Sequence, residues 1–295
     1  MNFSVNENNI PLQKIEADFL TQKNVELYVL REDLIHPEIS GNKWRKLKYN
    51  IEEAKSQGFK SIVTFGGAYS NHIAATAAAG QQFGLKTIGI IRGDEVSNST
   101  LALAKENGME LKFVSREEYK LKNANDYSNY YVVPEGGSNT LAVKGCAEIV
   151  ENITIDYDMI CCACGTGGTI AGLISSTDKK VLGFPALKGG KFLKEDIENL
   201  LFEYNPKKQY NNWSLITDYH FGGYAKVKPE LVDFVRDFKK NHNILLDFVY
   251  TGKMLFGLFD MIKNTDKLNG DKIVVVHTGG VQGNKGFEER FGIVL

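Results

Sequence analysis

Five apolar runs that end in or near glycine constrain the fold more than any other feature of this sequence. They are KSIVTFGG (60–67), KTIGIIRG (86–93), YDMICCACGTGG (157–168), KVLGFPAL (180–187) and KIVVVHTGG (272–280). Their apolar residues do not alternate with polar ones, which indicates parallel strands covered on both faces. Helix-like stretches such as SNHIAATAAAGQQFGL, STLALAKENGM and TIAGLISST follow them. The sequence therefore predicts an α/β fold built from βαβ units.

Length and charge limit the classes of partner. The chain has 295 residues, enough for two domains or one large domain with a substantial core. The formal net charge is -1, so no overall positive field attracts phosphate backbones, and no nucleic-acid partner is predicted despite the basic stretch GNKWRKLKYN. No run approaches the roughly 20 apolar residues of a membrane-spanning helix, so no membrane partner is predicted. The N-terminus lacks the pattern of a secretory signal.

Three of the four cysteines crowd into one apolar run. Cys161, Cys162 and Cys164 lie in MICCACGTGG, and Cys146 precedes them. The paired spacing and the histidines of a zinc site are missing, so no metal site is predicted. Free cysteine is among the most buried residue types, which favours small core thiols. We therefore expect a reduced, cytoplasmic protein.

The glycine turn CGTGGT is a candidate phosphate site. Gly165, Gly167 and Gly168 lie between a predicted strand and helix, where free backbone amides can bind an anion. Thr166 and Thr169 could add hydroxyl donors. The turn lacks the Lys-Ser/Thr ending of a nucleotide P-loop and the G-x-G-x-x-G spacing, which argues against ATP and NAD. A turn needed only for strand–helix packing is the alternative.

The turn GGAYSNH is a candidate carboxylate site. Ser70, Asn71 and His72 lie at the start of a predicted helix, where amides and the helix dipole favour an anion. Ser and Asn are also the preferred capping residues, so a purely structural role is an alternative. His72 has no matching nucleophile motif, and the G-x-S-x-G turn of a Ser-His hydrolase is absent. A structural histidine is thus as good an interpretation as a base.

Two lysines compete for a covalent role. Lys43 follows the turn ISGN, and Lys253 lies in YTGK. Lysine amines with a lowered pKa form covalent bonds with carbonyl compounds. We interpret the neighbours Arg45, Lys46 and Lys48 as helix-surface charges or phosphate helpers.

Tyr224 and Tyr250 each lie beside a glycine and are candidates for function, although most tyrosines are packing residues. Together with a lysine, a phosphate cradle and a carboxylate-binding helix start, they match the requirements of pyridoxal phosphate chemistry. That chemistry needs a lysine for the cofactor aldehyde, a phosphate anchor, a partner for the pyridine nitrogen and a clamp for the substrate carboxylate.

Six collinear motifs carry a family resemblance. GNKWRKLKY, GGAYSNHIAATAAAG, PEGGSN, GTGGTIAGL, YTGKMLFGL and HTGG resemble those of the 1-aminocyclopropane-1-carboxylate deaminase/D-cysteine desulfhydrase family, which are fold-type II pyridoxal-phosphate-dependent enzymes. The resemblance runs from about Arg31 to about Gly283. It implies two domains, each with a mostly parallel sheet flanked by helices, as in tryptophan synthase β. We expect a larger domain from residues 1–48 and 150–295, a smaller one from residues 49–149, and a homodimer.

The resemblance implies a set of contacts to pyridoxal 5'-phosphate. Lys43 would form the covalent bond to the cofactor and later carry the α-proton of the substrate. Asn71 would bind the 3′-oxygen of the pyridine ring, and the turn from Gly165 to Thr169 would hold the phosphate. Thr278 is the choice for the partner of the pyridine nitrogen, with Thr251 as the open alternative.

It also implies where a small amino-acid substrate would bind. Ser70, Asn71 and His72 would hold the substrate carboxylate. Tyr224 and Tyr250 match the two active-site tyrosines of the family, so Lys43, Ser70 and this pair are the predicted catalytic residues.

One departure from the family bears on the substrate. Its deaminases carry glutamate after the second tyrosine, where this chain has Thr251. A carboxylate keeps the pyridine nitrogen protonated more strongly than a hydroxyl does. The prediction is therefore β-elimination from a small amino acid such as D-cysteine, giving a keto acid and ammonia. A 1-aminocyclopropane-1-carboxylate deaminase and a non-catalytic binding protein are the alternatives.

Overall fold

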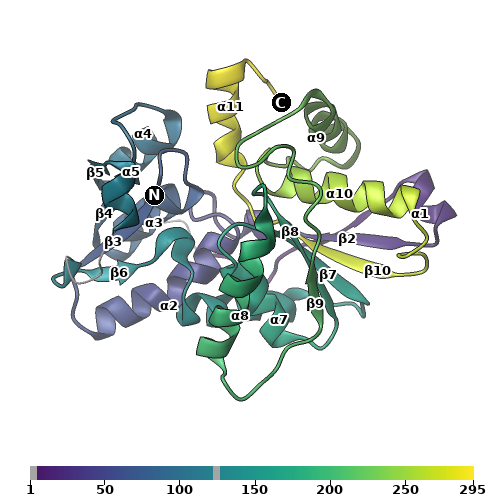
Figure 1. The fold of residues 1–295 in the computed structure, drawn as a ribbon, viewed down its shortest axis with the longest axis horizontal. Helices are drawn as coiled ribbons and strands as arrows, with labels where there is room; N and C mark the ends of the chain where they lie inside the picture. Colours follow the sequence, from purple (N-terminus) through teal and green to yellow (C-terminus); the bar gives the residue numbers. More distant parts are fainter. Residues whose placement is uncertain (1–4, 122–126) are drawn as a thin grey trace.

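The computed structural model describes residues 5–121 and 127–295, which form two sheets side by side (Figure 1). The larger sheet has the strand order β1-β2-β10-β7-β8-β9, and the smaller one has the order β5-β4-β3-β6. The strands are β1 Leu12–Ile15, β2 Glu26–Leu30, β3 Ser61–Gly67, β4 Lys86–Arg92, β5 Glu110–Val114, β6 Tyr131–Val133, β7 Met159–Cys164, β8 Lys180–Pro185, β9 Trp213–Leu215 and β10 Lys272–Val276. All neighbouring strands run parallel except the pair β1 and β2.

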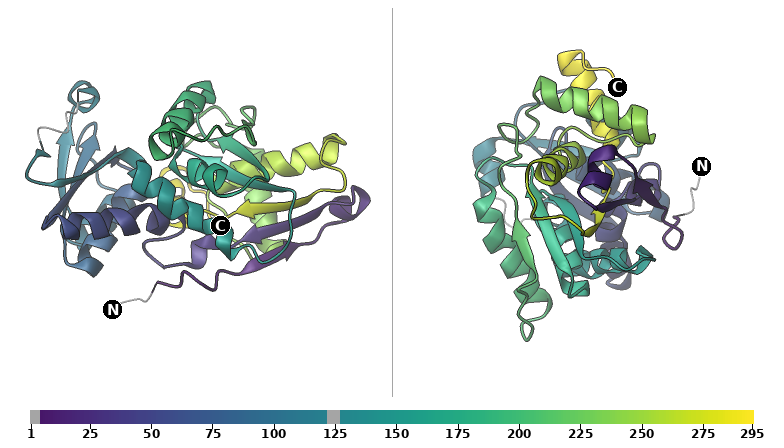
Figure 2. Two further views of the ribbon diagram at one scale, coloured as in Figure 1. Left: turned by 90° about the horizontal axis from the view of Figure 1, so that it is seen from below. Right: turned by 90° about the vertical axis from the view of Figure 1, so that its right-hand side faces the viewer.

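Helices cover the sheets, as the views in Figure 2 show. The α-helices are α1 Asp18–Gln22, α2 Asn42–Ser56, α3 Asn71–Phe83, α4 Ser99–Glu106, α5 Arg116–Lys120, α6 Thr140–Ala147, α7 Gly168–Ser176, α8 Leu193–Tyr204, α9 Pro229–His242, α10 Thr251–Asn264 and α11 Asn284–Phe291. Short 3-10 turns are η1 Glu32–Leu34, η3 Glu135–Gly137, η4 Glu148–Asn152, η5 Gly190–Phe192 and η6 Val281–Gly283. Among the described residues, no helix is long and apolar enough to cross a membrane.

Strand β7 explains why the apolar runs do not alternate. Met159, Cys161 and Ala163 face one hydrophobic cluster, while Ile160 and Cys162 face another. The first cluster includes α9 and α10 residues, and the second includes residues of α6, α7 and α8. Because both faces are covered, every position of the strand must be apolar. The α/β prediction, with two mostly parallel sheets flanked by helices, is confirmed.

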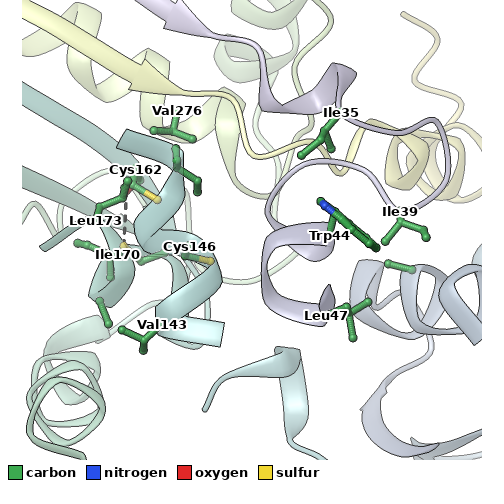
Figure 3. Close-up of a cluster of buried hydrophobic side chains, with 14 of the residues drawn as sticks. Ile35, Ile39, Trp44, Leu47, Val143, Cys146, Cys162, Ile170, Leu173 and Val276 are labelled. Carbon is green, nitrogen blue, oxygen red and sulfur yellow. Dashed lines mark hydrogen bonds between the residues drawn. The ribbon is translucent and has the colours of Figure 1, made fainter. Parts of the chain in front are cut away.

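One hydrophobic cluster joins the two sheets. It contains Ile62 of β3 and Ala75 of α3 together with Ile160 and Val274 of the larger sheet. Figure 3 shows part of this cluster, with Trp44 and Leu47 of α2 and with Cys146 and Cys162. The predicted boundary after residue 48 falls inside α2, which ends at Ser56. The division into two domains therefore stays a proposal.

Candidate active site

A cavity of about 450 Å³ lies where the carboxyl ends of strands from both sheets meet. The smaller sheet contributes residues 67–72 after β3, Arg92 of β4, Arg116 after β5 and Glu135 after β6. The larger sheet contributes residues 163–167 at the end of β7, Leu187 after β8 and residues 278–280 after β10. The start of α2 adds Asn42, Lys43 and Lys46. Crevices of this kind are where open α/β sheets bind ligands.

Lys43 reaches the cavity from the first turn of α2. The preceding Gly41 has φ +60°, and a Cβ atom there would lie 2.0 Å from the carbonyl oxygen of Thr278. The amide of Asn42 donates to that same oxygen at 3.3 Å. The close backbone approach fixes the start of α2 against the loop after β10. Desolvation, reinforced by the charge of Lys46, lowers the pKa of the Lys43 amine to about 7.

Lys46 lies one turn further along α2 and is only 2% exposed. Its Nζ donates to the carbonyl oxygen of Gly136 at 3.0 Å and to Oγ of Ser138 at 3.1 Å. Ser138 Oγ is in turn 2.6 Å from Oγ1 of Thr166. Desolvation lowers the pKa of Lys46. Of the two interpretations of Lys46, the surface charge is wrong, because its amine lies inside the cavity beside the glycine turn. The other, a helper at the phosphate, stays a prediction.

Arg45 and Lys48 of α2 point away from the cavity into an ion cluster. Arg45 is 1% exposed, and its guanidinium donates to both carboxylate oxygens of Glu32, at 3.1 and 3.0 Å. Lys48 Nζ contacts Glu7 and Glu148, at 2.7 and 2.5 Å. The interpretation of Arg45 as a surface charge is therefore also wrong. Both side chains hold helix α2 in place and neither lines the cavity.

The glycine turn after β7 lies opposite Lys46. Helix α7 begins at Gly168, and a Cβ atom there would lie 2.7 Å from Ser138 Oγ and 3.2 Å from Lys46 Nζ. Thr169 Oγ1 accepts a hydrogen bond from Asn42 Nδ2 at 2.7 Å. Around the glycine turn, the described residues thus combine a lysine amine, hydroxyls and the amides of a helix N-terminus. That donor set is suited to an anion.

The start of α3 brings the three predicted carboxylate-binding residues to the cavity wall. Ser70 is the N-cap, and its Oγ accepts from the amide of Ile73 at 3.4 Å. Asn71 Oδ1 accepts from Nε2 of Gln282 at 3.3 Å. Ser70, Asn71 and His72 all line the cavity. The capping role is present, and it leaves the side chains of Ser70 and Asn71 at the cavity.

His72 is held as a neutral ring. Thr64 gives its hydroxyl proton to the carbonyl oxygen of Val133 at 2.9 Å, so it accepts a hydrogen bond from His72 Nε2 at 2.8 Å. Nδ1 of His72 is buried and has no hydrogen-bond partner among the described residues. Desolvation and the charges of Lys43 and Lys46 lower the pKa of His72 well below 6.5. The arrangement favours an uncharged structural histidine over a base.

Tyr224 and Tyr250 lie next to each other at the cavity wall. Their ring centroids are 6.1 Å apart, and the rings meet edge to face. Desolvation raises the pKa of both hydroxyls, and well above 10 for Tyr250. Both phenols are therefore protonated at neutral pH. In that state they donate hydrogen bonds and do not remove protons.

The two candidate threonines have different surroundings. Thr278 lines the cavity and is 6% exposed. Thr251 is fully buried and is not part of the cavity lining. Its hydroxyl donates to Oδ1 of Asp247 at 2.7 Å and accepts from the Asp247 amide at 3.0 Å. The geometry favours Thr278 over Thr251 as a residue that could contact a ligand.

Three charged residues of the cavity wall were not singled out from the sequence: Arg92, Arg116 and Glu135. Arg92 and Arg116 lie at the carboxyl ends of neighbouring strands, and the guanidinium of Arg92 lies 5.3 Å from the ring centre of Tyr119. The strand-end position is a general signal that could have identified them. Among the described residues, no group of three or more histidine, cysteine or carboxylate side chains could hold a metal ion.

Comparison with known proteins gives the family of this chain. A family model described as pyridoxal-phosphate dependent enzyme matches residues 4–279, almost the entire chain. The chain belongs to this family.

Relatives place this pyridoxal-phosphate enzyme in a narrower group. A provisionally named 1-aminocyclopropane-1-carboxylate deaminase of Thermotoga maritima is 33% identical over 282 residues, which cover 87% of this chain and 89% of the relative. The mitochondrial bifunctional D-cysteine desulfhydrase/1-aminocyclopropane-1-carboxylate deaminase of Arabidopsis thaliana is 30% identical over 292 residues. These cover 88% of this chain and 73% of the relative. A crystal structure described as that of the ACC (1-aminocyclopropane-1-carboxylate) deaminase homologue matches this chain with a TM-score of 0.85 at 28% identity. The match covers 98% of this chain and 96% of that one. This enzyme is a fold-type II member of the deaminase/desulfhydrase family.

The cavity fits pyridoxal 5'-phosphate. Lys46, Thr166, Thr169 and the glycine turn of residues 165–167 line the cavity, and their amine, hydroxyls and backbone amides are donors that suit a phosphate. Lys43, whose amine has a lowered pKa, lies three residues before Lys46 on the same helix. Thr278 faces the same cavity from the loop after β10. The amine of Lys43 and the donors around the glycine turn thus suit the aldehyde and the phosphate of the cofactor.

Proposed function

We propose that this enzyme deaminates a small amino acid, giving a keto acid and ammonia. The observation that carries the proposal is Lys43, whose amine has a pKa lowered to about 7 and lies in the same cavity as the paired Tyr224 and Tyr250. A lysine in this state is a base near neutral pH when its amine is free. The bound cofactor would supply the electron sink that stabilises negative charge on the α-carbon of the substrate.

The residues of the chain have separate tasks in this proposal. Ser70, Asn71 and the amides at the start of α3 bind the substrate carboxylate, because a helix N-terminus favours an anion. With a substrate that has an α-hydrogen, such as D-cysteine, Lys43 Nζ accepts that proton and holds it for later return. 1-Aminocyclopropane-1-carboxylate has no α-hydrogen, so with that substrate Lys43 Nζ would instead accept a proton from a ring methylene group. Tyr224 and Tyr250, which are protonated, donate hydrogen bonds to the substrate and orient it. Neutral His72 supports α3 through its hydrogen bond to Thr64.

The cofactor contacts are proposed on the same basis. Lys46, Thr166 and the backbone amides of residues 165–169 would hold the phosphate, and Asn71 would bind the 3′-oxygen. Thr278 would contact the pyridine nitrogen, since Thr251 is engaged by Asp247. Fixed donors of this kind orient the reacting centre without reorganisation during the reaction.

Two substrates are supported by different observations. The names of the relatives favour 1-aminocyclopropane-1-carboxylate. The side chains favour D-cysteine, because Thr278 offers a neutral hydroxyl where a carboxylate would make the ring a stronger electron sink. Breaking a carbon–carbon bond of a cyclopropane needs the stronger sink, whereas expulsion of a β-substituent needs less. We take 1-aminocyclopropane-1-carboxylate as the first substrate to test and D-cysteine as the second.

The decisive assay measures release of keto acid and ammonia from these two compounds, from D-serine and from β-chloro-D-alanine. The proposal predicts turnover of at least one compound and a yellow protein in which borohydride fixes a pyridoxyl group on Lys43. Lys43→Ala should be colourless and inactive. Lys48→Ala is the matched control from the same helix and should keep both colour and turnover. A colourless wild-type protein with no lysine adduct would refute the proposal.

A non-catalytic binding protein would give a different result. It would show a shift in the cofactor spectrum with amino acids but no keto acid. The homodimer and the cytoplasmic location stay predictions, and gel filtration with light scattering tests the first of them.

A further inference from the structure

The loop that carries Tyr224 has an unfavourable backbone. Phe221 and Ala225 have φ values of 53° and 52°, although neither is a glycine, and Gly222 and Gly223 between them have 97° and 123°. Left-handed conformations of residues with a Cβ atom are uncommon and cost free energy. Such a backbone persists only where surrounding contacts hold it. Tyr224 is also 41% exposed, so the packing of its own ring fixes it only in part.

Lys253 supplies contacts that hold this loop. Its Nζ donates to the carbonyl oxygen of Gly223 at 2.7 Å and to that of His220 at 3.0 Å. The side chain is 2% exposed, and no carboxylate lies within ion-pair distance in the part of the chain that the structure describes. Desolvation lowers its pKa to about 8. A buried amine without a carboxylate in direct contact is costly, and its two carbonyl contacts, together with the more distant charge of Asp247, offset the cost.

The same helix start also fixes the partner tyrosine. Tyr250 is the N-cap of α10, and Lys253 lies on the first turn of that helix. Asp247 accepts hydrogen bonds from the amides of Tyr250 and Thr251, at 2.9 and 2.8 Å, which anchors the helix start. One element therefore carries Tyr250 and, through Lys253, holds the neighbouring loop with Tyr224. Lys253 itself does not line the cavity, so it does not compete with Lys43.

We propose that Lys253 is a positioning residue that holds the loop of residues 220–225 so that the Tyr224 hydroxyl stays against Tyr250 at the substrate end of the cavity. This rests on the proposed function, in which the two hydroxyls orient the substrate. Loss of the two hydrogen bonds would let the loop relax and move the hydroxyl. A shift of about 1 Å in an orienting group is enough to lower a rate by roughly 100-fold.

A double-mutant cycle tests how Lys253 acts. Tyr224→Phe, Lys253→Met and the double variant are compared on the amino acid that the deamination assay identifies. We expect each single variant to lose about 10- to 100-fold in kcat with a smaller change in KM. The double variant should be no slower than Tyr224→Phe alone, because Lys253 acts through that hydroxyl. Losses that multiply in the double variant would overturn the proposal.

A second measurement does not depend on turnover. Lys226 follows the loop and is exposed, so trypsin cleavage after it reports loop mobility. Cleavage should be several-fold faster in Lys253→Met than in wild type, and Lys253→Gln, which keeps donors, should fall between them. Lys263→Met, in the last turn of the same helix, is the control and should be cleaved as wild type. Equal cleavage of Lys253→Met and wild type would refute the positioning role, whereas absent colour or turnover in wild type would refute only the proposed function.

Discussion

Lys43 and Lys46 lie on one face of α2, yet their amines have different partners. Lys46 donates to Gly136 and Ser138, whereas Lys43 has no hydrogen-bond partner among the described residues. Burial disfavours the charged form of both amines. An amine that has a pKa near 7 and no hydrogen-bond partner is reactive toward carbonyl compounds, whereas an amine engaged in hydrogen bonds acts as a fixed donor. A spacing of three residues predicts that Lys43 and Lys46 lie on the same face of the helix, but only the fold decides which amine stays without a hydrogen-bond partner.

The lowered pKa of Lys43 predicts a pH dependence of stability in the cofactor-free protein. The folded value is about 7, and the unfolded value is about 10.4. Between them the unfolded state binds more protons, so the free energy of unfolding rises with pH. Lys43→Met lacks this contribution and should be the more stable protein near pH 7 by on the order of 2 kcal/mol, with the difference shrinking toward pH 10. Urea unfolding of both proteins across this range measures it, and parallel curves would contradict the prediction.

The buried ion pair between Arg45 and Glu32 predicts that the stability lost on replacing Arg45 depends on whether Glu32 remains charged. Arg45→Met leaves Glu32, which is fully buried, without its guanidinium and should destabilise the protein by about 3–5 kcal/mol. Desolvation already raises the pKa of Glu32, so the loss should be smaller in acid, where the carboxyl is protonated. Adding Glu32→Gln should restore most of the stability. Lys48→Ala, in the more exposed part of the cluster, should cost about 1 kcal/mol.

At the scale of elements, α2 connects the ion cluster to the cavity, and its first residue is bound to the loop after β10. Gly41→Ala should push the start of α2 away from the loop after β10, because the added Cβ atom would overlap the carbonyl group of Thr278. We expect a loss of more than 3 kcal/mol in stability together with weaker cofactor binding. Gly58→Ala, just past the other end of α2, is the matched control: its φ is +80°, and its Cβ atom would meet nothing within 4 Å. It should cost about 1 kcal/mol and leave cofactor affinity unchanged, and similar losses in both variants would contradict the role of the close approach.

The strands that the sequence pattern predicted are those covered on both faces. β3, β4, β7, β8 and β10 are continuous apolar runs, and all lie inside their sheets. Four of the five strands not predicted, β1, β5, β6 and β9, are sheet edges of three to five residues. These edge strands are partly solvated and are either short or interrupted by polar residues, so periodicity does not identify them. The fifth, β2, pairs with the edge strand β1.

At the scale of the molecule, the cavity has a charge that the whole chain lacks. The net charge is -1, but the lining carries Lys43, Lys46, Arg92 and Arg116 against Glu135. A cleft with one sign of charge attracts oppositely charged ligands and raises their association rate. The sequence alone conceals this, since the strand ends that carry Arg92 and Arg116 come together only when β4 and β5 pair.

This field predicts that binding of pyridoxal phosphate to the cofactor-free protein is salt-dependent. The association rate constant should fall several-fold between about 20 and 200 mM salt. Arg92→Gln with Arg116→Gln should slow association at low salt and flatten the dependence, without loss of stability. The control pair is Lys105→Gln with Lys112→Gln, which removes the same charge from the smaller sheet region outside the cavity. Stopped-flow absorbance measures the rates, and an equal salt slope in both pairs would contradict the prediction.

Most of the predicted site residues line one cavity, because glycine turns at strand ends converge when parallel strands pair. Lys43, Ser70, Asn71, His72, Tyr224, Tyr250 and Thr278 all line it. Thr251 does not, although it adjoins Tyr250 in the sequence, because helix α10 begins there and turns its hydroxyl toward Asp247. Side-chain direction at a helix start depends on the capping contacts, which a linear motif does not contain.

The four thiols have a consequence for handling and for kinetics. All are buried, three in β7 and one in α6, and burial raises the pKa of Cys146 to about 11. Figure 3 shows Cys146 and Cys162 among the apolar side chains of the core. A maleimide or iodoacetamide can react only after the core opens. The native enzyme should therefore resist such reagents, and the slow rate at which it consumes them would measure how often the layers around β7 separate.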